Sequence, residues 1–234
     1  MLPKPSRPEY STTIPSSGRK IKYNPFTVRE EKILVLAAES NDTDEISNAI
    51  VNILSNCITS PSDLNVEELA LFDIEYLFLK ARSKSAGEKI SLIVTDPQDE
   101  SFQVKHEILI DKIGIKKSEN HTNIVDIDDN IKLSMKYPDI SFFRDGIDMS
   151  NISSSLDVIC KCVGTIIDGD EVYNRGDMSD GELIEWLESL TTKQFKGISD
   201  FFQTMPKLSH SFTIKNTNTG KDFTMELEGL ADFF

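Results

Sequence analysis

The segment from Leu69 to Glu88 has the most apolar helical pattern in the chain. Its apolar residues are spread around most of a helical circumference, so no broad polar face remains. The pattern predicts a buried central helix that ends near Gly87, a residue suited to a left-handed cap. Asp73 and Glu75 project about 200° apart on this helix. We therefore expect each carboxylate to have its own partner, because the two cannot hold one ligand together.

Two more helices are predicted before this one. Thr27 to Glu30 has the Thr-x-x-Glu form of a capping box and begins a helix that runs to about Ser40. The acidic residues from 42 to 45 open the second helix. Its apolar stripe has i, i+3, i+4, i+7 spacing and comprises Ile46, Ala49, Ile50, Ile53, Leu54, Cys57 and Ile58. We interpret Cys57 as a small buried apolar side chain rather than a reactive thiol.

After Gly87 the pattern changes to the alternation that is typical of β-strands. Three runs rich in Ile, Val and Leu carry it: Lys89–Thr95, Ser101–Ile110 and Asn130–Tyr137. A turn signal at 96–99 separates the first two. These runs predict a small antiparallel sheet.

Helical spacing returns from Ser150 to Ile167. A polar loop over 168–177 follows, and Ser179 to Glu182 is a second capping box that begins another helix. A further helix carries Phe195 to Met205 and stops at Pro206.

A hairpin is expected near each end of the chain. Tyr10–Ile14 and Arg19–Tyr23 flank Pro-Ser-Ser-Gly, while 209–215 and 222–227 flank Asn-Thr-Asn-Thr-Gly. Five prolines within residues 1–25 exclude a lasting helix there and favour an extended arm.

Together these patterns predict an α+β protein, in which a helical body carries a small antiparallel β-rich insertion and terminal β-hairpins. The expected segments are a Pro-rich arm and hairpin (1–26), the first part of the helical body (27–87), the β-rich insertion (88–138), the second part of the body (139–206), and a C-terminal hairpin with an aromatic tail (207–234).

The charge of the chain narrows the classes of partner. Its 39 Asp and Glu residues against 25 Lys and Arg give a net charge of −14, which repels phosphate backbones and argues against nucleic acid. A basic or amphipathic protein is the better electrostatic match, although acidity that serves solubility alone explains the same composition.

The apolar runs and the cysteines indicate the compartment. No apolar run approaches the ~20 residues that a bilayer demands, and the first residues lack an export signal, so no membrane association is expected. Three cysteines are too few for a disulfide scaffold and fit a reducing compartment. We expect cytoplasmic synthesis.

Residue types that carry chemistry occur without the spacing that chemistry requires. The sulfurs of Cys160 and Cys162 would point to nearly opposite sides of a helix, with no histidine nearby in sequence to complete a zinc site. His106, His121 and His210 lie in strand-like or loop contexts without a nucleophile motif.

The acidic and glycine-containing segments also fail the known patterns. The clusters 126–129 and 168–171 fit solvated loops, since the second fails the EF-hand pattern at Val172. Arg-Gly-Asp at 175–177 matches the cell-adhesion tripeptide only by chance. The glycines never reach the spacing of a phosphate-binding loop. We expect no catalytic residue, no cofactor and no metal, hence not an enzyme; an enzyme acting at Asp168, Asp170 or Glu171 is the distant alternative.

Two sets of residues resemble a known family. Residues 14–34, Ile-Pro-Ser-Ser-Gly-Arg-Lys-Ile-Lys-Tyr-Asn-Pro-Phe-Thr-Val-Arg-Glu-Glu-Lys-Ile-Leu, and residues 73–88, Asp-Ile-Glu-Tyr-Leu-Phe-Leu-Lys-Ala-Arg-Ser-Lys-Ser-Ala-Gly-Glu, are similar to baseplate hub proteins of T-even-type contractile-tailed bacteriophages. The ending Leu-Glu-Gly-Leu-Ala-Asp-Phe-Phe is similar too. The resemblance spans nearly the whole chain and is densest in 14–88.

The resemblance implies a non-enzymatic structural or assembly protein of the baseplate hub, present in the host cytoplasm during assembly and then in the virion tail baseplate. Its partners would be hub, tube or tape-measure components, and itself in a homo-oligomer. Some relatives carry cysteine pairs in the β-rich segments that suggest a zinc knuckle. The turns at 96–99 and 216–220 hold no cysteine here, so no metal is implied. The alternative is a tail-assembly chaperone that shields the tape-measure protein and is absent from mature virions.

The Pro-rich arm, its hairpin and the aromatic C-terminus are the segments that a subunit of an assembly would use for contacts. The candidate contact residues are Tyr10, Ile14, Phe26, Phe233 and Phe234. For Phe233 and Phe234 the alternative is that they fold back onto their own domain.

Overall fold

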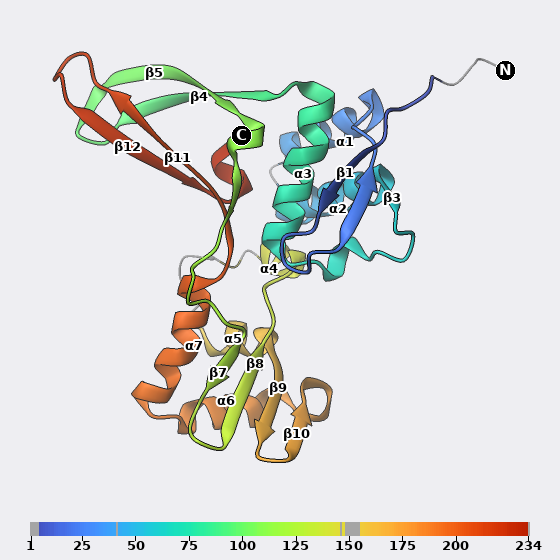
Figure 1. The fold of residues 1–234 in the computed structure, drawn as a ribbon, viewed down its shortest axis with the longest axis vertical. Helices are drawn as coiled ribbons and strands as arrows, with labels where there is room; N and C mark the ends of the chain where they lie inside the picture. The colour runs from blue at the N-terminus through green and yellow to red at the C-terminus, as the bar shows by residue number, and fades with distance from the viewer. Residues whose placement is uncertain (1–4, 41, 146, 148–154, 234) are drawn as a thin grey trace. The chain divides into compact units, whose positions relative to one another are not determined.

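The structure is a computed structural model that describes residues 5–40, 42–145, 147 and 155–233 (Figure 1). The chain divides into two compact units: unit 1 comprises the residues up to Lys116 together with those from Lys207, and unit 2 comprises Lys117–Pro206. Helices and small antiparallel sheets make up both units, so the predicted α+β class is confirmed.

The described residues of unit 1 form three α-helices, α1 (Val28–Ser40), α2 (Thr43–Cys57) and α3 (Leu71–Ala86). Their local signals act as predicted. The Thr27 N–H donates to the Glu30 carboxylate at 2.8 Å, and Asp42 caps α2 by accepting from two backbone N–H groups. Gly87 follows α3 with φ of 112°, a value open to glycine. The predicted central helix is buried: the members exposed by less than a tenth include Phe72, Ile74, Leu77, Phe78, Leu79 and Ala81.

The predicted N-terminal hairpin is β1 (Tyr10–Thr13) and β2 (Lys20–Tyr23), joined by a turn in which Gly18 has φ of 69°. The short strand β3 (Ile58–Ser60), directly after α2, pairs with β2 and completes a three-stranded sheet. This third strand attaches the hairpin to the helices.

Unit 1 also contains two packed β-ribbons, which lie side by side in Figure 1. One is β4 (Lys89–Asp96) with β5 (Asp99–Leu109). The other is β11 (Lys207–Lys215) with β12 (Asp222–Glu228), and β6 (Gly114–Lys116) adds to β11. Side chains of the two ribbons meet, as the edge-to-face pair of Phe102 and Phe223 at 6.2 Å shows. The remaining short elements of unit 1 are 3₁₀ turns: η1 (Val66–Glu68), η2 (Ile110–Lys112) and η5 (Leu230–Phe233).

Unit 2 is built on a four-stranded antiparallel sheet in the order β10-β9-β8-β7. The strands are β7 (Ile124–Asp126), β8 (Ile131–Met135), β9 (Val163–Asp168) and β10 (Glu171–Asn174). The helices are α4 (Ile140–Arg144), α5 (Leu156–Cys162), α6 (Asp180–Ser189) and α7 (Thr192–Thr204), with the 3₁₀ turn η4 (Arg175–Asp177) between β10 and α6. One apolar core joins strands and helices, including Leu133, Ile159, Val163, Leu183, Ile198 and Phe202.

Two predicted segments are corrected here. The runs at 89–95 and 101–110 pair in unit 1, but the run at 130–137 contributes β8 to unit 2, so the three do not form one sheet. The helix predicted over 150–167 is helical only at Leu156–Cys162; its C-terminal part is β9, and 150–154 lies outside the described residues. Val163, Thr165, Ile166 and Ile167 are β-branched, which favours a strand.

The predicted helical body is divided between the two units as well. Helices α1 to α3 belong to unit 1, and α4 to α7 belong to unit 2. Within the part of the chain that the structure describes, every helix is too short or too polar to traverse a lipid bilayer.

Candidate functional site

The first carboxylate of α3 holds the N-terminal hairpin. Asp73 is fully buried, and its side chain accepts hydrogen bonds from the backbone N–H of Ser16, at 2.9 Å, and from the Ser16 hydroxyl. Burial raises the pKa of Asp73, and the two bonds from Ser16 act in the opposite direction. Asp73 thus connects the central helix to the turn between β1 and β2.

The second carboxylate of α3 holds the C-terminal segment. Glu75 Oε1 accepts a 2.9 Å hydrogen bond from the backbone N–H of Leu230, at the start of η5. Burial raises the pKa of Glu75 to about 7, against the smaller effect of that bond. The prediction that Asp73 and Glu75 each need a separate partner is confirmed, and both partners belong to the chain itself.

The five candidate contact residues are placed differently from one another. Ile14, Phe26 and Phe233 are 1%, 7% and 0% exposed, so they are core residues of unit 1, and Phe233 folds back onto its own unit. A partner contact through these three would need them to leave the core. Tyr10 is half-buried, with its ring 5.9 Å from that of Tyr23, and its contact with a partner stays a prediction. Phe234 lies outside the described residues.

A groove of about 570 Å³ lies in unit 1 between β5 and β11. The His106 ring from β5 stacks on Phe212 from β11 with centroids 4.2 Å apart, and Leu109 at its margin is 41% exposed. Lys89 forms a 2.8 Å ion pair with Glu107. The full lining is Lys89, His106, Glu107, Ile108, Leu109, Lys112, His210, Ser211 and Phe212. No pattern in the sequence indicates this groove, because its walls come from strands about one hundred residues apart.

The three cysteines are free thiols in apolar surroundings. Burial raises the pKa of Cys57 and of Cys162 to about 12, so both thiols are protonated at neutral pH and poor nucleophiles. The described residues contain no group of three or more His, Cys, Asp or Glu side chains placed to hold a metal ion.

His121 in unit 2 has a packing role. Its Nδ1 lies 2.9 Å from the Thr204 hydroxyl and its Nε2 lies 2.9 Å from the Tyr137 hydroxyl, while its ring packs against Phe201. Burial lowers the pKa of His121. Both ring nitrogens are therefore engaged by side chains of the chain itself.

The predicted polar loop at 168–177 is an ordered hairpin and turn. Gly169, with φ of 56°, lies in the tight turn between β9 and β10. In the other acidic cluster, the Asp128 carboxylate accepts from the backbone N–H groups of Asn130 and Ile131. Asp128 thus stabilises a turn, in line with the loop interpretation of its cluster, whereas the loop predicted over 168–177 is wrong at Glu171–Asn174, which form strand β10.

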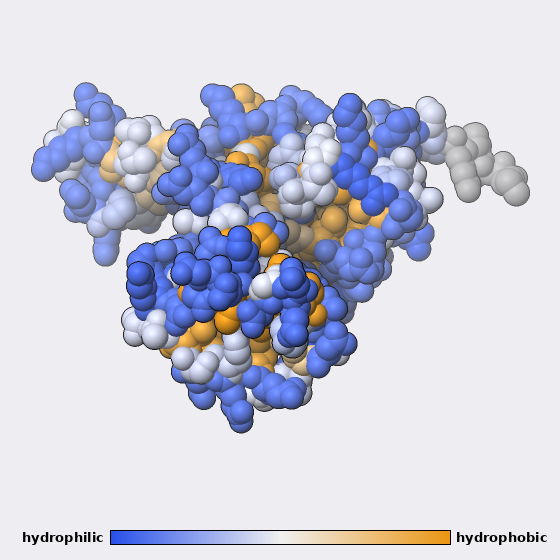
Figure 2. Space-filling model, turned by 60° about the horizontal axis from the view of Figure 1, so that its bottom comes forward, coloured by the Kyte–Doolittle hydropathy of each residue, from blue (hydrophilic) through white to orange (hydrophobic). Residues whose placement is uncertain are grey.

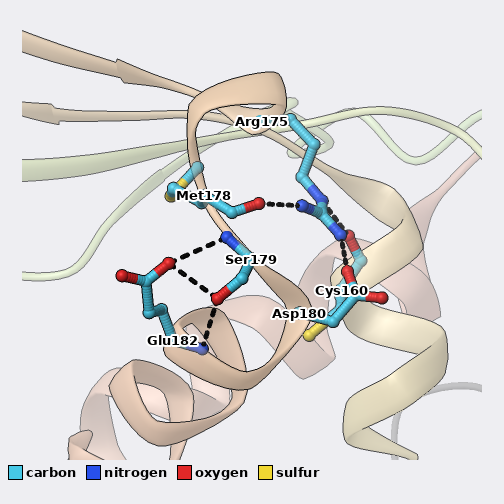
Figure 3. Close-up of polar contacts among 6 residues, drawn as sticks. All are labelled: Cys160, Arg175, Met178, Ser179, Asp180 and Glu182. Carbon is cyan, nitrogen blue, oxygen red and sulfur yellow. Dashed lines mark hydrogen bonds and ion pairs between the residues drawn. The ribbon is translucent and has the colours of Figure 1, made fainter.

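Arg175 links the end of this hairpin to two helices (Figure 3). Its Nε donates to the carbonyl of Cys160 on α5 at 3.2 Å, its Nη1 donates to the carbonyl of Met178 at 2.9 Å, and it forms an ion pair with Asp180. The neighbouring capping box of Ser179 and Glu182 begins α6, as predicted. The Arg-Gly-Asp tripeptide therefore supplies a structural arginine. Two of its partners are backbone carbonyls, which leave no sequence signal.

A family model described as T4 bacteriophage base plate protein matches residues 7–234, which include both units. The chain belongs to this family. No curated protein and no solved structure gives a significant match. The resemblance to baseplate proteins of T-even-type phages is thereby confirmed, and membership in the T4 base plate family associates the chain with the baseplate of a phage tail.

Proposed function

We propose that this T4-type base plate protein is a non-enzymatic structural or assembly component of the baseplate hub, and that it acts through protein–protein contacts. The observation that carries the proposal is the family match over residues 7–234. Its partners would be other tail proteins of the hub, tube or tape measure, and a second copy of itself, with no nucleic acid among them.

The use of the ionisable groups supports a binding role over catalysis. Asp73, Glu75 and Arg175 are engaged by partners within the chain, and His121 is held at both nitrogens. The surface of the molecule is what a partner can contact, and Figure 2 shows mainly hydrophilic residues there, with smaller hydrophobic patches among them. The net charge of −14 makes the chain acidic, and an acidic surface would select partners and oppose premature self-association.

The proposal is tested on purified virions. Quantitative mass spectrometry should find this chain at a fixed ratio to a tail-tube protein, and a particle reconstruction should contain its density at the tail tip. Infection with a phage that lacks the gene should yield no complete baseplates. Complete, infective particles from that phage would overturn the hub assignment.

The alternative is a tail-assembly chaperone that shields the tape-measure protein. The exposed apolar side chains of α1 favour it, because Val28, Val35 and Leu36 are 81%, 55% and 55% exposed and could cover apolar helices of a client. A chaperone would be required for assembly but absent from the finished virion. The same mass spectrometry therefore separates the two functions.

A further inference from the structure

One edge of strand β11 is occupied over only part of its length. β6 pairs with Lys207–Ser209 in an antiparallel register, with Ser209 opposite Gly114. Among the described strands, none pairs with β11 on that side beyond Ser209, whereas β12 accompanies the other side as far as Lys215. The segment from Ser211 to Lys215 is thus an open strand edge.

In this segment, every second residue directs its backbone N–H and C=O groups away from β12. The Leu208 carbonyl accepts from Gly229 on the β12 side, and the Asn216 N–H donates to the Lys221 carbonyl on the same side. Because backbone groups alternate direction along an antiparallel strand, the even-numbered residues of β11 bond toward β12. Ser211, Thr213 and Lys215 therefore present their N–H and C=O groups to the open edge.

The groove described above lies beside this edge. Its lining includes Ser211 and Phe212 of β11, and Lys112 of η2, which directly precedes β6; no residue of β12 takes part. The groove is therefore on the open side of β11. Residues 106–109 of β5 form its opposite wall, and Lys112 lies at the end where β6 begins.

We propose that an extended segment of another protein adds as a strand to the open edge of β11, in the place that a longer β6 would occupy, and lies in the groove against β5. Such strand addition obtains affinity from backbone hydrogen bonds and specificity from alternate side chains. Phe212 and Leu109 in the lining suit a segment whose inward side chains are apolar, because such side chains would contact both residues.

The charge of the site indicates acidic outward side chains on the incoming segment. Lys112 lines the groove, and Lys215 ends the open edge opposite Asp222 of β12, while the one carboxylate of the lining, Glu107, is paired with Lys89. This is a basic site on a chain of net charge −14. A second copy would bring a further charge of −14 and an equally basic edge, so an alternating apolar and acidic segment of a different protein is the better occupant.

This inference deepens the proposed function, since it specifies the chemistry of one partner. It depends only on unit 1 and is tested on the full chain in solution. Its failure would leave the virion experiment unaffected, and absence from the virion would leave strand binding intact.

The probe is a fluorescein-labelled peptide, Thr-Val-Glu-Val-Glu-Val-Thr, followed by fluorescence anisotropy. We expect saturable binding, at least tenfold weaker binding of the peptide with lysine in place of glutamate, and loss of binding when alternate amides are N-methylated. Hydrogen exchange should slow at Ser211, Thr213 and Lys215. Equal binding of the methylated peptide, or slowed exchange confined to other residues, overturns the proposal.

Charge variants test the location without disturbing the core. Lys112→Glu and Lys215→Glu, both at exposed residues, should each weaken binding at least fivefold. Lys105→Glu is the matched control, because Lys105 is exposed on β5 but does not line the groove, and its binding should change less than twofold. Circular dichroism confirms that each variant is folded. Two results would contradict the assignment of the groove to an acidic partner. One is an equal loss of peptide binding in the Lys105→Glu control, and the other is a dimer of the protein in sedimentation that the peptide dissociates.

Discussion

The backbone N–H of Leu230 donates a 2.9 Å hydrogen bond to Oε1 of Glu75, across 155 positions of sequence. One helical turn includes both this carboxylate and Asp73, which binds Ser16 of the N-terminal hairpin. Helix α3 is thus the element to which the segments from both ends of the described chain are attached. The Asp-Ile-Glu segment that carries part of the family resemblance supplies both attachments.

Glu75 gives a prediction about pH. Burial raises its pKa from 4.5 to about 7, so the folded protein holds a proton that the unfolded chain releases at lower pH. The contribution of this proton to the free energy of unfolding is fully present below about pH 4.5 and is lost as the pH rises through about 7. At about 1.4 kcal/mol per pKa unit, the loss over these roughly 2.5 units is at most about 3–4 kcal/mol.

The variant Glu75→Gln should remove this dependence, because glutamine is neutral and its Oε1 can still accept from Leu230. Urea denaturation at pH 5 to 8 should show the variant more stable than the wild type at pH 8 and similar at pH 5. Glu100→Gln, at an exposed residue, is the control and should leave the slope unchanged. A parallel pH profile for Glu75→Gln and the wild type would contradict the assigned burial.

Ser16 tests the attachment of the N-terminal hairpin. Ser16→Ala removes the hydroxyl that donates to the buried Asp73 and should lower the free energy of unfolding by about 1–2 kcal/mol. Hydrogen exchange should accelerate in Tyr10–Tyr23 more than in α2. Ser17→Ala is the matched control, since the exposed Ser17 hydroxyl accepts from the backbone N–H of Arg19 within the same turn. An equal effect of both variants would show that the Asp73 contact is not the source of stability.

Two helical glycines are expected to respond in opposite ways to alanine. A Cβ at Gly197 of α7 would lie 2.7 Å from Cγ1 of Val125, a stiff buried side chain of β7, so Gly197→Ala should destabilise unit 2 by about 1–3 kcal/mol. A Cβ at Gly181 of α6 meets nothing within 4 Å. Gly181→Ala should therefore stabilise the helix by up to about 1 kcal/mol. Thermal unfolding followed by Trp186 fluorescence measures both, and a stabilising Gly197→Ala would refute the packing of α7 on β7.

Arg175 tests the link between the β9–β10 hairpin and its neighbouring helices. Arg175→Ala leaves the carbonyls of Cys160 and Met178 without this donor and should cost about 1–3 kcal/mol of stability. The fluorescence of Trp186, the single tryptophan, reports the change because Trp186 lies on α6. Lys193→Ala, at an exposed residue of α7, should have little effect. Wild-type stability of Arg175→Ala would contradict a structural role.

The sequence predicted the elements whose signals are local. The capping residues at 27–30, 42–45 and 179–182 begin helices, and the two terminal hairpins form around their turn residues. These signals depend on neighbours within a few positions, so they survive without knowledge of the tertiary structure.

The remaining features depend on distant partners. The strands β3 and β6 are only three residues long, and each exists because it pairs with a strand remote in sequence. The same holds for β9, where sheet pairing overrides the helical spacing that continues from α5. The burial of Ile14, Phe26 and Phe233 follows from docking on the rest of unit 1, which periodicity does not reveal.

The division of unit 1 between two separate stretches of sequence affects the order of synthesis. Residues 117–206 are continuous, so the whole of unit 2 is synthesised before β11 and β12. Until then the β5 wall of the groove, the acceptor Glu75 and the buried Ile90 of β4 lack the partners that the C-terminal segment supplies. Unit 1 is thus the last part of this baseplate protein to mature.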